Sequence, residues 1–161
     1  MWNKLKAFLL QPTVPLLQYL ACAAPLALAG SMVVILSVAL MLMLFGVDFE
    51  SIESPDAGDS ILMIALIGPI IETFLLAGGV KLLQKETKLS PVGIATTSAI
   101  LWGLFHGLFA PIWFFGVVWS FFVFTCGYIA WRKVSLKHAL AAAFVPHAVN
   151  NSLILLTSSL G

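Results

Sequence analysis

Long apolar runs separated by short polar breaks dominate the chain. A helix that crosses a bilayer needs about 20 mostly apolar residues, and five segments satisfy this requirement. They are residues 16–45, 61–83, 92–110, 112–131 and 136–160. The pattern therefore predicts an all-α fold, a polytopic membrane helix bundle with about five transmembrane helices.

Residues typical of helix starts lie at the breaks between these segments. Ser90 followed by Pro91 matches an N-cap and a first helical residue. Asp59 and Ser60 can cap the second predicted span, and Ser135 can cap the fifth. The sequence contains no internal repeat and no linker long enough for a second domain. We expect a single transmembrane domain over residues 1–161, with residues 1–15 as an interfacial N-terminal segment.

Composition supports a membrane location. The chain is 61% hydrophobic and only 9% charged, with a mean hydropathy of +1.06, whereas soluble domains carry about 25% charged residues. A net charge of +1 without a basic run argues against nucleic-acid binding. The two cysteines form no C-x-x-C motif, so neither a disulfide framework nor a zinc knuckle is supported. Membrane lipid is the partner that this composition requires.

The charged residues predict an orientation. With five spans, all three groups of cations fall on one side of the membrane, and an acidic first loop falls on the other. Because positively charged short loops stay in the cytoplasm, we expect the N-terminus inside and the C-terminus outside. The cationic groups are Lys4 and Lys6; Lys81, Lys85 and Lys88; and Arg132, Lys133 and Lys137. The acidic loop holds Asp48, Glu50, Glu53, Asp56 and Asp59.

Three titratable side chains lie deep inside predicted spans: Glu72, His106 and His147. An ionisable group at membrane depth costs a few kcal/mol, so it normally faces the bundle interior and has a partner. Because the three residues lie on three different helices, we expect them to converge on one polar site. Asn151 is four residues after His147 and therefore shares its helix face.

Two prolines accompany these residues. Pro69 precedes Glu72 by three positions, and Pro146 directly precedes His147. A proline inside a helix frees a backbone carbonyl one turn back, and protein or water must satisfy that carbonyl at membrane depth. A simple kink, without any role in a site, is the alternative reading of both prolines.

The residue types allow two kinds of chemistry. A carboxylate in an apolar site can act as a general base toward water, while imidazole and carboxamide N–H groups can stabilise an oxyanion. Alternatively, Glu72, His106 and His147 match the His₂-carboxylate ligand set of catalytic zinc. The helical spacing alone does not choose between these two readings.

At these positions the chain resembles the CAAX prenyl protease and bacteriocin-processing (CPBP, or Abi) family of intramembrane peptidases. The family carries E-E-x-x-x-R after a proline, then F-x-x-x-H, then H-x-x-x-N, on separate helices. The corresponding segments here are PIIETFLLAG at 69–78, WGLFH at 102–106 and HAVNN at 147–151. The resemblance covers about half of the chain and implies an integral membrane protein of a prokaryotic plasma membrane.

Two positions depart from the family pattern. The second Glu of the first motif is Thr73 here, and its Arg is Ala77. These positions are four apart, so the family's residues could pair on one helix face. Losing one partner would strand a buried charge, whereas losing both leaves none. Trp102 stands at the position of the second motif's Phe and keeps an aromatic ring.

The resemblance implies a function and a role for each matching residue. Glu72 with His106 would activate the attacking water, and His147 with Asn151 would stabilise the oxyanion, in hydrolysis of a membrane-associated peptide or protein. A metal-dependent version would make Glu72, His106 and His147 ligands of a divalent metal such as zinc; the metal-free version is the one we favour. A catalytically inactive scaffold or bacteriocin immunity protein is the first alternative. A small proton or metal transporter is the second.

Overall fold

The computed structural model describes residues 2–46 and 60–158. Every element in this part of the chain is helical, which confirms the predicted all-α class. The acidic loop and the cap at Asp59 lie outside the described residues. The elements are α1 (Trp2–Leu10), α2 (Leu16–Leu44), the π-helical segment η2 (Met63–Ile67), α3 (Gly68–Glu86), α4 (Pro91–Gly107), α5 (Pro111–Arg132) and α6 (Leu136–Ser158).

Four stretches of helix are long and apolar enough to cross a membrane. They are Leu16–Leu44, Met63–Glu86, Pro111–Arg132 and Leu136–Thr157. The third predicted span becomes α4, which ends at Gly107 after 17 residues rather than at residue 110. The structure is thus an all-α bundle of the kind found in integral membrane proteins.

Two of the predicted caps are present. The Ser90 hydroxyl accepts a hydrogen bond from the Gly93 amide at 3.1 Å at the start of α4. The Ser135 hydroxyl accepts one from the His138 amide at 3.2 Å at the start of α6. Each hydroxyl satisfies one of the amides that the first turn of a helix leaves without an internal acceptor.

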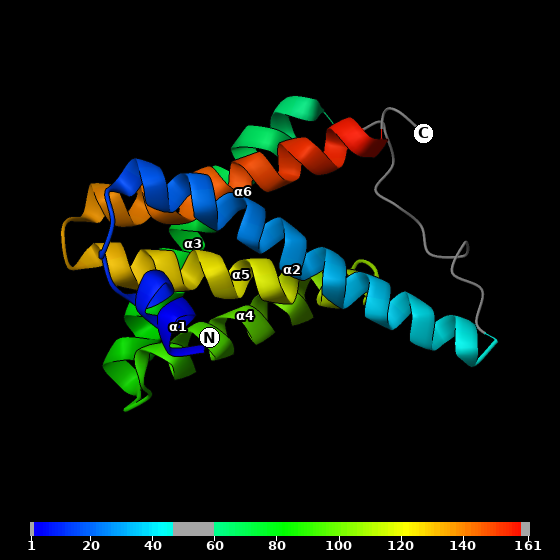
Figure 1. Ribbon diagram of the computed structural model, residues 1–161, viewed down its shortest axis with the longest axis horizontal. Helices are drawn as coiled ribbons and strands as arrows, with labels where there is room; N and C mark the ends of the chain where they lie inside the picture. The colour runs from blue at the N-terminus through cyan, green and yellow to red at the C-terminus, as the bar shows by residue number, and fades with distance from the viewer. Residues whose placement is uncertain (1, 47–59, 159–161) are drawn as a thin grey trace.

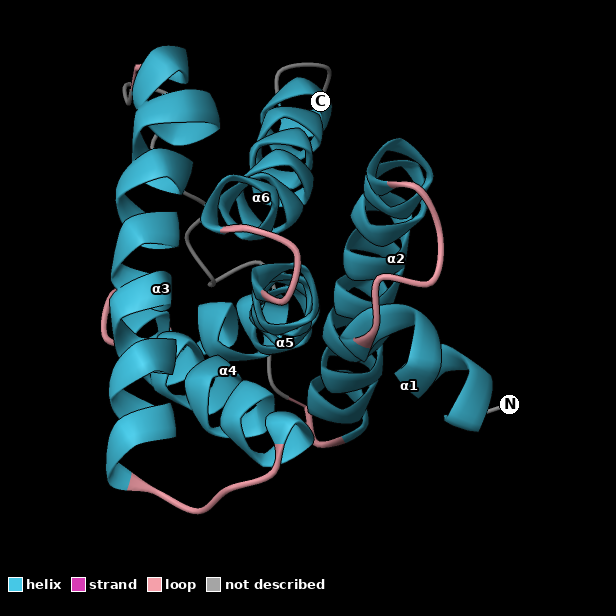
Figure 2. Ribbon diagram, turned by 90° about the vertical axis from the view of Figure 1, so that its left-hand side faces the viewer, coloured by secondary structure: helices cyan, strands magenta, loops and turns pink. Residues whose placement is uncertain are grey.

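Helix α5 forms the centre of the bundle. Figure 2 shows α2, α4 and α6 around it, with α3 beyond α4 and α6. Nearly every side chain of α5 from Ser120 to Trp131 is buried, because other helices pack against α5 on all sides. A helix that is buried all round needs no polar stripe, which explains why this segment carries no charge before Arg132.

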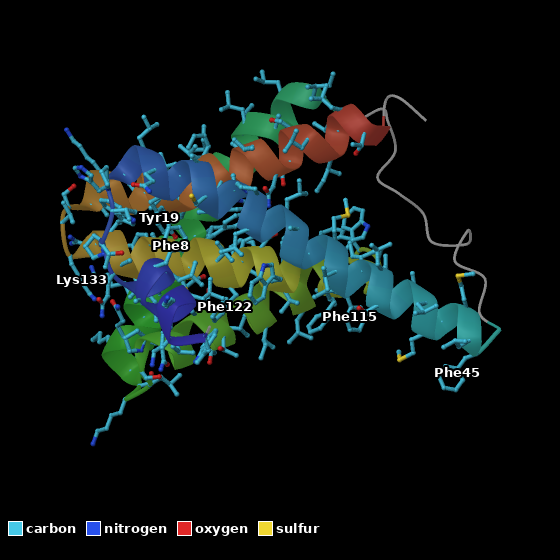
Figure 3. All side chains as sticks on the ribbon, viewed as in Figure 1. Phe8, Tyr19, Phe45, Phe115, Phe122 and Lys133 are labelled. Carbon is cyan, nitrogen blue, oxygen red and sulfur yellow. The ribbon has the colours of Figure 1, made fainter. Side chains whose placement is uncertain are left out.

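The two ends of the bundle differ in their packing. At one end the α1 ring of Phe8 stacks on Tyr19 of α2 at 5.1 Å, and Lys133 donates a hydrogen bond to the Leu10 carbonyl at 3.1 Å (Figure 3). At the other end α2 extends beyond the remaining helices (Figure 1). Phe45 follows the end of α2 and is 79% exposed. Phe45 and the exposed apolar side chains of α2 that precede it are suited to contact with lipid.

Buried hydroxyl and amide groups join α2, α5 and α6. The hydroxyls of Ser31 and Ser120 lie 2.8 Å apart, and Asn150 donates to the Ser120 hydroxyl at 3.3 Å. Ser120 also donates to the Ala27 carbonyl at 3.3 Å. In a bilayer such small polar residues hold helices together, because lipid supplies no competing hydrogen bonds.

Gly127 allows α6 to approach α5 at its proline. Pro146 has no N–H for the Ala142 carbonyl one turn back. A Cβ added at Gly127 would lie 2.8 Å from this carbonyl oxygen and 2.6 Å from the Tyr19 hydroxyl oxygen. Backbone atoms cannot yield as a flexible side chain does, so only glycine fits at this position.

We therefore expect Gly127→Ala to lower the free energy of unfolding by about 1–3 kcal/mol through overpacking. Gly78→Ala is the matched control, since a Cβ at Gly78 meets nothing within 4 Å, and it should leave stability unchanged or slightly raised. Thermal unfolding of both purified variants in detergent measures the difference. Equal melting temperatures for the two variants would contradict the close approach of α5 and α6.

Candidate active site

Glu72 lies in the second turn of α3, just after an irregular stretch of helix. The amide of Gly68 bonds to the carbonyl of Met63, five residues back, in place of the usual four. Pro69 follows and has no amide hydrogen. The π-helical segment η2 therefore ends directly before the turn that carries Glu72, and π-helical turns are frequent at functional sites.

The structure brings Glu72, His106 and His147 together from three helices. Oε2 of Glu72 lies 3.8 Å from Nε2 of His106 and 3.6 Å from Nε2 of His147. Both separations exceed hydrogen-bond length, and this buried oxygen has no hydrogen-bond partner. One carboxylate oxygen thus faces two imidazole nitrogens without bonding to either. Their roles in catalysis stay a prediction.

The three side chains differ in exposure. The Glu72 side chain is 23% exposed and that of His106 is 18% exposed, whereas that of His147 is 6% exposed. Glu72 and His106 therefore lie at the accessible side of the site, and His147 forms its inner wall.

A backbone hydrogen bond orients His106. Its Nδ1 lies 2.9 Å from the Trp102 carbonyl oxygen, one turn back on α4. Because a carbonyl only accepts hydrogen bonds, Nδ1 carries the proton, and Nε2 of the neutral ring then presents its lone pair. That lone pair faces Glu72. A molecule with two donor hydrogens, placed between Nε2 of His106 and Oε2 of Glu72, would satisfy both acceptors.

Aromatic rings surround the imidazoles. Phe124 stacks on His147 with a centroid distance of 4.9 Å, and Phe121 meets the same ring edge to face at 5.3 Å. Phe121 also lies 5.4 Å from His106 and stacks on Trp102 at 4.6 Å. These contacts give the polar atoms apolar walls, which exclude bulk water from the inner side.

Sequence reasoning missed Phe121 and Phe124. Both lie in the uncharged α5 segment, where aromatic residues are frequent and indistinguishable from core. Their spacing of three residues places them on one helix face. That spacing was the only signal available.

The side chain of Asn151 is bonded elsewhere in the bundle. Its Nδ2 donates a hydrogen bond to the Ile64 carbonyl in η2 at 3.0 Å. The neighbouring Asn150 donates to Ser120. One of the two N–H groups of Asn151 is thereby engaged, and its expected part in oxyanion stabilisation stays a prediction.

Thr73, which departs from the motif of the resembled family, lies in surroundings that suit a neutral residue. Thr73 is 2% exposed, and its hydroxyl has no hydrogen-bond partner. It lines a cavity of about 200 Å³ between α3 and α6, together with Ile70, Phe74, Leu140, Ala141 and Phe144. A carboxylate in this apolar cavity would need a partner, and the partner position is Ala77.

The metal-dependent reading depends on the same three side chains. His106 has the outer bond typical of a metal ligand, an Nδ1–H donated to a backbone carbonyl. Nevertheless, within residues 2–46 and 60–158 no group of three or more His, Cys, Asp or Glu side chains is arranged to hold a metal ion. The metal-dependent version therefore stays a prediction.

Comparison with known proteins identifies no relative: no protein-family model, no curated protein and no solved structure matches the chain.

We expect Phe124→Ala to lower the free energy of unfolding by about 3–5 kcal/mol, because the ring is 1% exposed and stacks on His147. The matched control is Phe45→Ala, which removes an equally large ring that is 79% exposed. Thermal unfolding in detergent should separate the two variants by many degrees. Similar melting temperatures would show that Phe124 does not form the wall of the site.

Proposed function

We propose that the protein is an intramembrane endopeptidase that hydrolyses a peptide bond of a membrane-associated peptide or protein. The observation that carries the proposal is the position of Glu72 Oε2, which faces two imidazole nitrogens at 3.6 and 3.8 Å and has no hydrogen-bond partner. A carboxylate acceptor and an imidazole lone pair held this way are suited to bind one water molecule between them.

The geometry suits such a water. Two acceptors bonded by the same water at about 2.8 Å lie roughly 4–4.5 Å apart, close to the 3.8 Å between Glu72 and His106. The water donates one hydrogen to Oε2 of Glu72 and the other to Nε2 of His106. Its oxygen lone pairs then point away from both groups, toward a substrate carbonyl.

Hydrolysis follows from these positions. Glu72 accepts a proton as the water oxygen forms a bond to the carbonyl carbon. His147 donates an N–H to the oxygen of the tetrahedral intermediate. The C–N bond then breaks, and the proton held by Glu72 passes to the departing amine. The products are a carboxylic acid and an amine, and Glu72 returns to its starting state.

The family resemblance and the membrane topology form part of the same proposal. The three motifs of the CPBP family place their polar residues on α3, α4 and α6, the helices that meet at the site. We propose five spans, with α4 as the short one, an N-terminus inside, and a prokaryotic plasma membrane as the location. All eight cations lie in α1 or near the α3–α4 and α5–α6 turns, which supports this orientation.

A non-catalytic scaffold or bacteriocin immunity protein is the second candidate. It is favoured by the hydrogen bond that engages Asn151 with the Ile64 carbonyl, together with the absence of the Glu–Arg pair. In this case the Glu72 cluster would only connect helices. Full complementation of a deletion strain by Glu72→Gln would favour this candidate over the peptidase.

We expect Glu72→Gln to reduce kcat by at least about 10²-fold, because the amide cannot accept the proton from water. His106→Ala should have a comparable effect. The assay uses purified protein in liposomes and a set of quenched-fluorescent peptides that each carry a transmembrane segment. Inhibition of the wild type by 1,10-phenanthroline, reversed by zinc, would assign the metal-dependent version.

The matched controls are Glu86→Gln and His138→Ala. Glu86 forms a surface ion pair with Lys85 at 3.1 Å, and His138 lies at the start of α6. Both controls should retain cleavage. Peptide cleavage that survives Glu72→Gln as well as the controls do would refute the proposed mechanism.

The orientation has its own test. On a background with Cys22 and Cys126 replaced by serine and alanine, Lys88→Cys should react with an impermeant maleimide only after the cells are opened. Asp56→Cys should react in intact cells, because the acidic loop is predicted outside. The reverse labelling pattern would invert the orientation without affecting the catalytic proposal.

A further inference from the structure

The Ile64 carbonyl lacks a helical hydrogen-bond donor. The amide four residues on belongs to Gly68 and bonds to Met63 instead. The residue five positions on, which would donate in a π-helix, is Pro69 and has no N–H. An unsatisfied carbonyl costs several kcal/mol at membrane depth. The sequence of η2 therefore requires a donor from another part of the chain.

Asn151 supplies this donor. Its Nδ2 lies 3.0 Å from the Ile64 oxygen and is contributed by α6. We infer that Asn151 is a positioning residue, whose bond to the carbonyl left free at Ile64 by Pro69 fixes η2 and α3 against α6 and thereby holds Glu72 beside His147. The inference rests on the proposed function insofar as the Glu72–His147 arrangement is catalytic.

The packing along the seam between α6 and the continuous η2–α3 segment shows why one hydrogen bond matters. An open surface groove of about 440 Å³ lies between η2 and α6, and Phe144 joins its lining to that of the 200 Å³ cavity at Thr73. Apolar contact between the two helices is therefore incomplete. The Ile64–Asn151 hydrogen bond crosses between these two elements and helps to hold them together.

The bond and the candidate active site connect the same two helices. Ile64 lies eight residues before Glu72, and Asn151 lies one helical turn after His147. The Ile64–Asn151 bond and the Glu72–His147 contact thus form two successive links across the seam. Without the first link, the second has no fixed separation, and a misplacement of 1 Å in a catalytic group can cost about 10²-fold in rate.

A double-mutant cycle with Pro69 tests the inference. Pro69→Ala restores an amide hydrogen within the helix, so the Ile64 carbonyl no longer needs Asn151. We expect Asn151→Ala to lower the Tm in detergent by about 2–5 °C in the native background. In the Pro69→Ala background the same substitution should lower the Tm by less than half as much. Asn150→Ala is the control, because its amide bonds to Ser120, and its effect should be equal in both backgrounds.

Kinetics distinguish positioning from oxyanion stabilisation. For a positioning residue, Asn151→Ala should reduce kcat by about 10²-fold in the native background and by less than 10-fold after Pro69→Ala. A direct oxyanion donor would lose the same factor in both backgrounds, with no coupling in Tm, and this result would overturn the inference. If Asn151→Ala alone yields no folded protein, recovery of folded protein by Pro69→Ala supports it.

The peptidase proposal and the positioning role of Asn151 can be refuted independently of each other. Coupling in Tm without any peptide cleavage would refute the peptidase while supporting the bond between η2 and α6. Cleavage that depends on Glu72, without coupling between Pro69 and Asn151, would support the peptidase and refute the positioning role.

Discussion

The arrangement of the bundle depends on one constraint: a polar group inside a bilayer has no water to bond with. Each buried polar atom must find a partner within the protein or remain costly. The hydroxyls of Ser31 and Ser120 and the Nδ2 group of Asn150 satisfy this condition directly. Glu72 Oε2 does not, since no donor reaches it. Other described buried atoms also lack a partner, the Thr73 hydroxyl among them, but Oε2 of Glu72 faces two imidazole nitrogens and is therefore the candidate for chemistry.

The same constraint links the two prolines to the positions of the helices. Pro69 leaves the Ile64 carbonyl without a helical donor, and Asn151 on another helix provides one. Pro146 removes the helical donor for the Ala142 carbonyl, which lies close to Gly127 on α5. In both cases the proline leaves a backbone acceptor that faces a neighbouring helix. The prolines thus determine which residues of the adjacent helices must be asparagine or glycine.

Much of the bundle could be predicted from the sequence. Hydropathy located the long helices to within a few residues, because twenty apolar residues in succession have few alternatives to a membrane helix. The cost of burying charge similarly predicted that Glu72, His106 and His147 would meet. The shorter extent of α4 was not foreseen, since Leu108 and Phe109 continue the apolar pattern after the helix ends.

The hydrogen-bond partner of Asn151 was harder to predict than its proximity to His147. Spacing placed Asn151 on the same helix face as His147, but it did not reveal that η2 adopts the π-helical register. That register depends on where the amide of Gly68 finds its acceptor. The shift by one residue leaves Ile64, rather than Ala65, as the carbonyl that Asn151 satisfies. A local change in backbone pairing therefore decides whether an amide side chain faces the site or connects two helices.

The neutral residues Thr73 and Ala77 follow from the same reasoning. Thr73 lies beside an apolar cavity, where an ionised side chain would require a partner within the membrane. Since Ala77 offers none, a charge restored at Thr73 alone would be more costly than the present hydroxyl. The Glu72 cluster lies on another flank of α3 and makes no use of either position. The neutral residues at 73 and 77 therefore leave the Glu72 carboxylate and both imidazoles in place, and the link between the two helices comes from the Ile64–Asn151 bond.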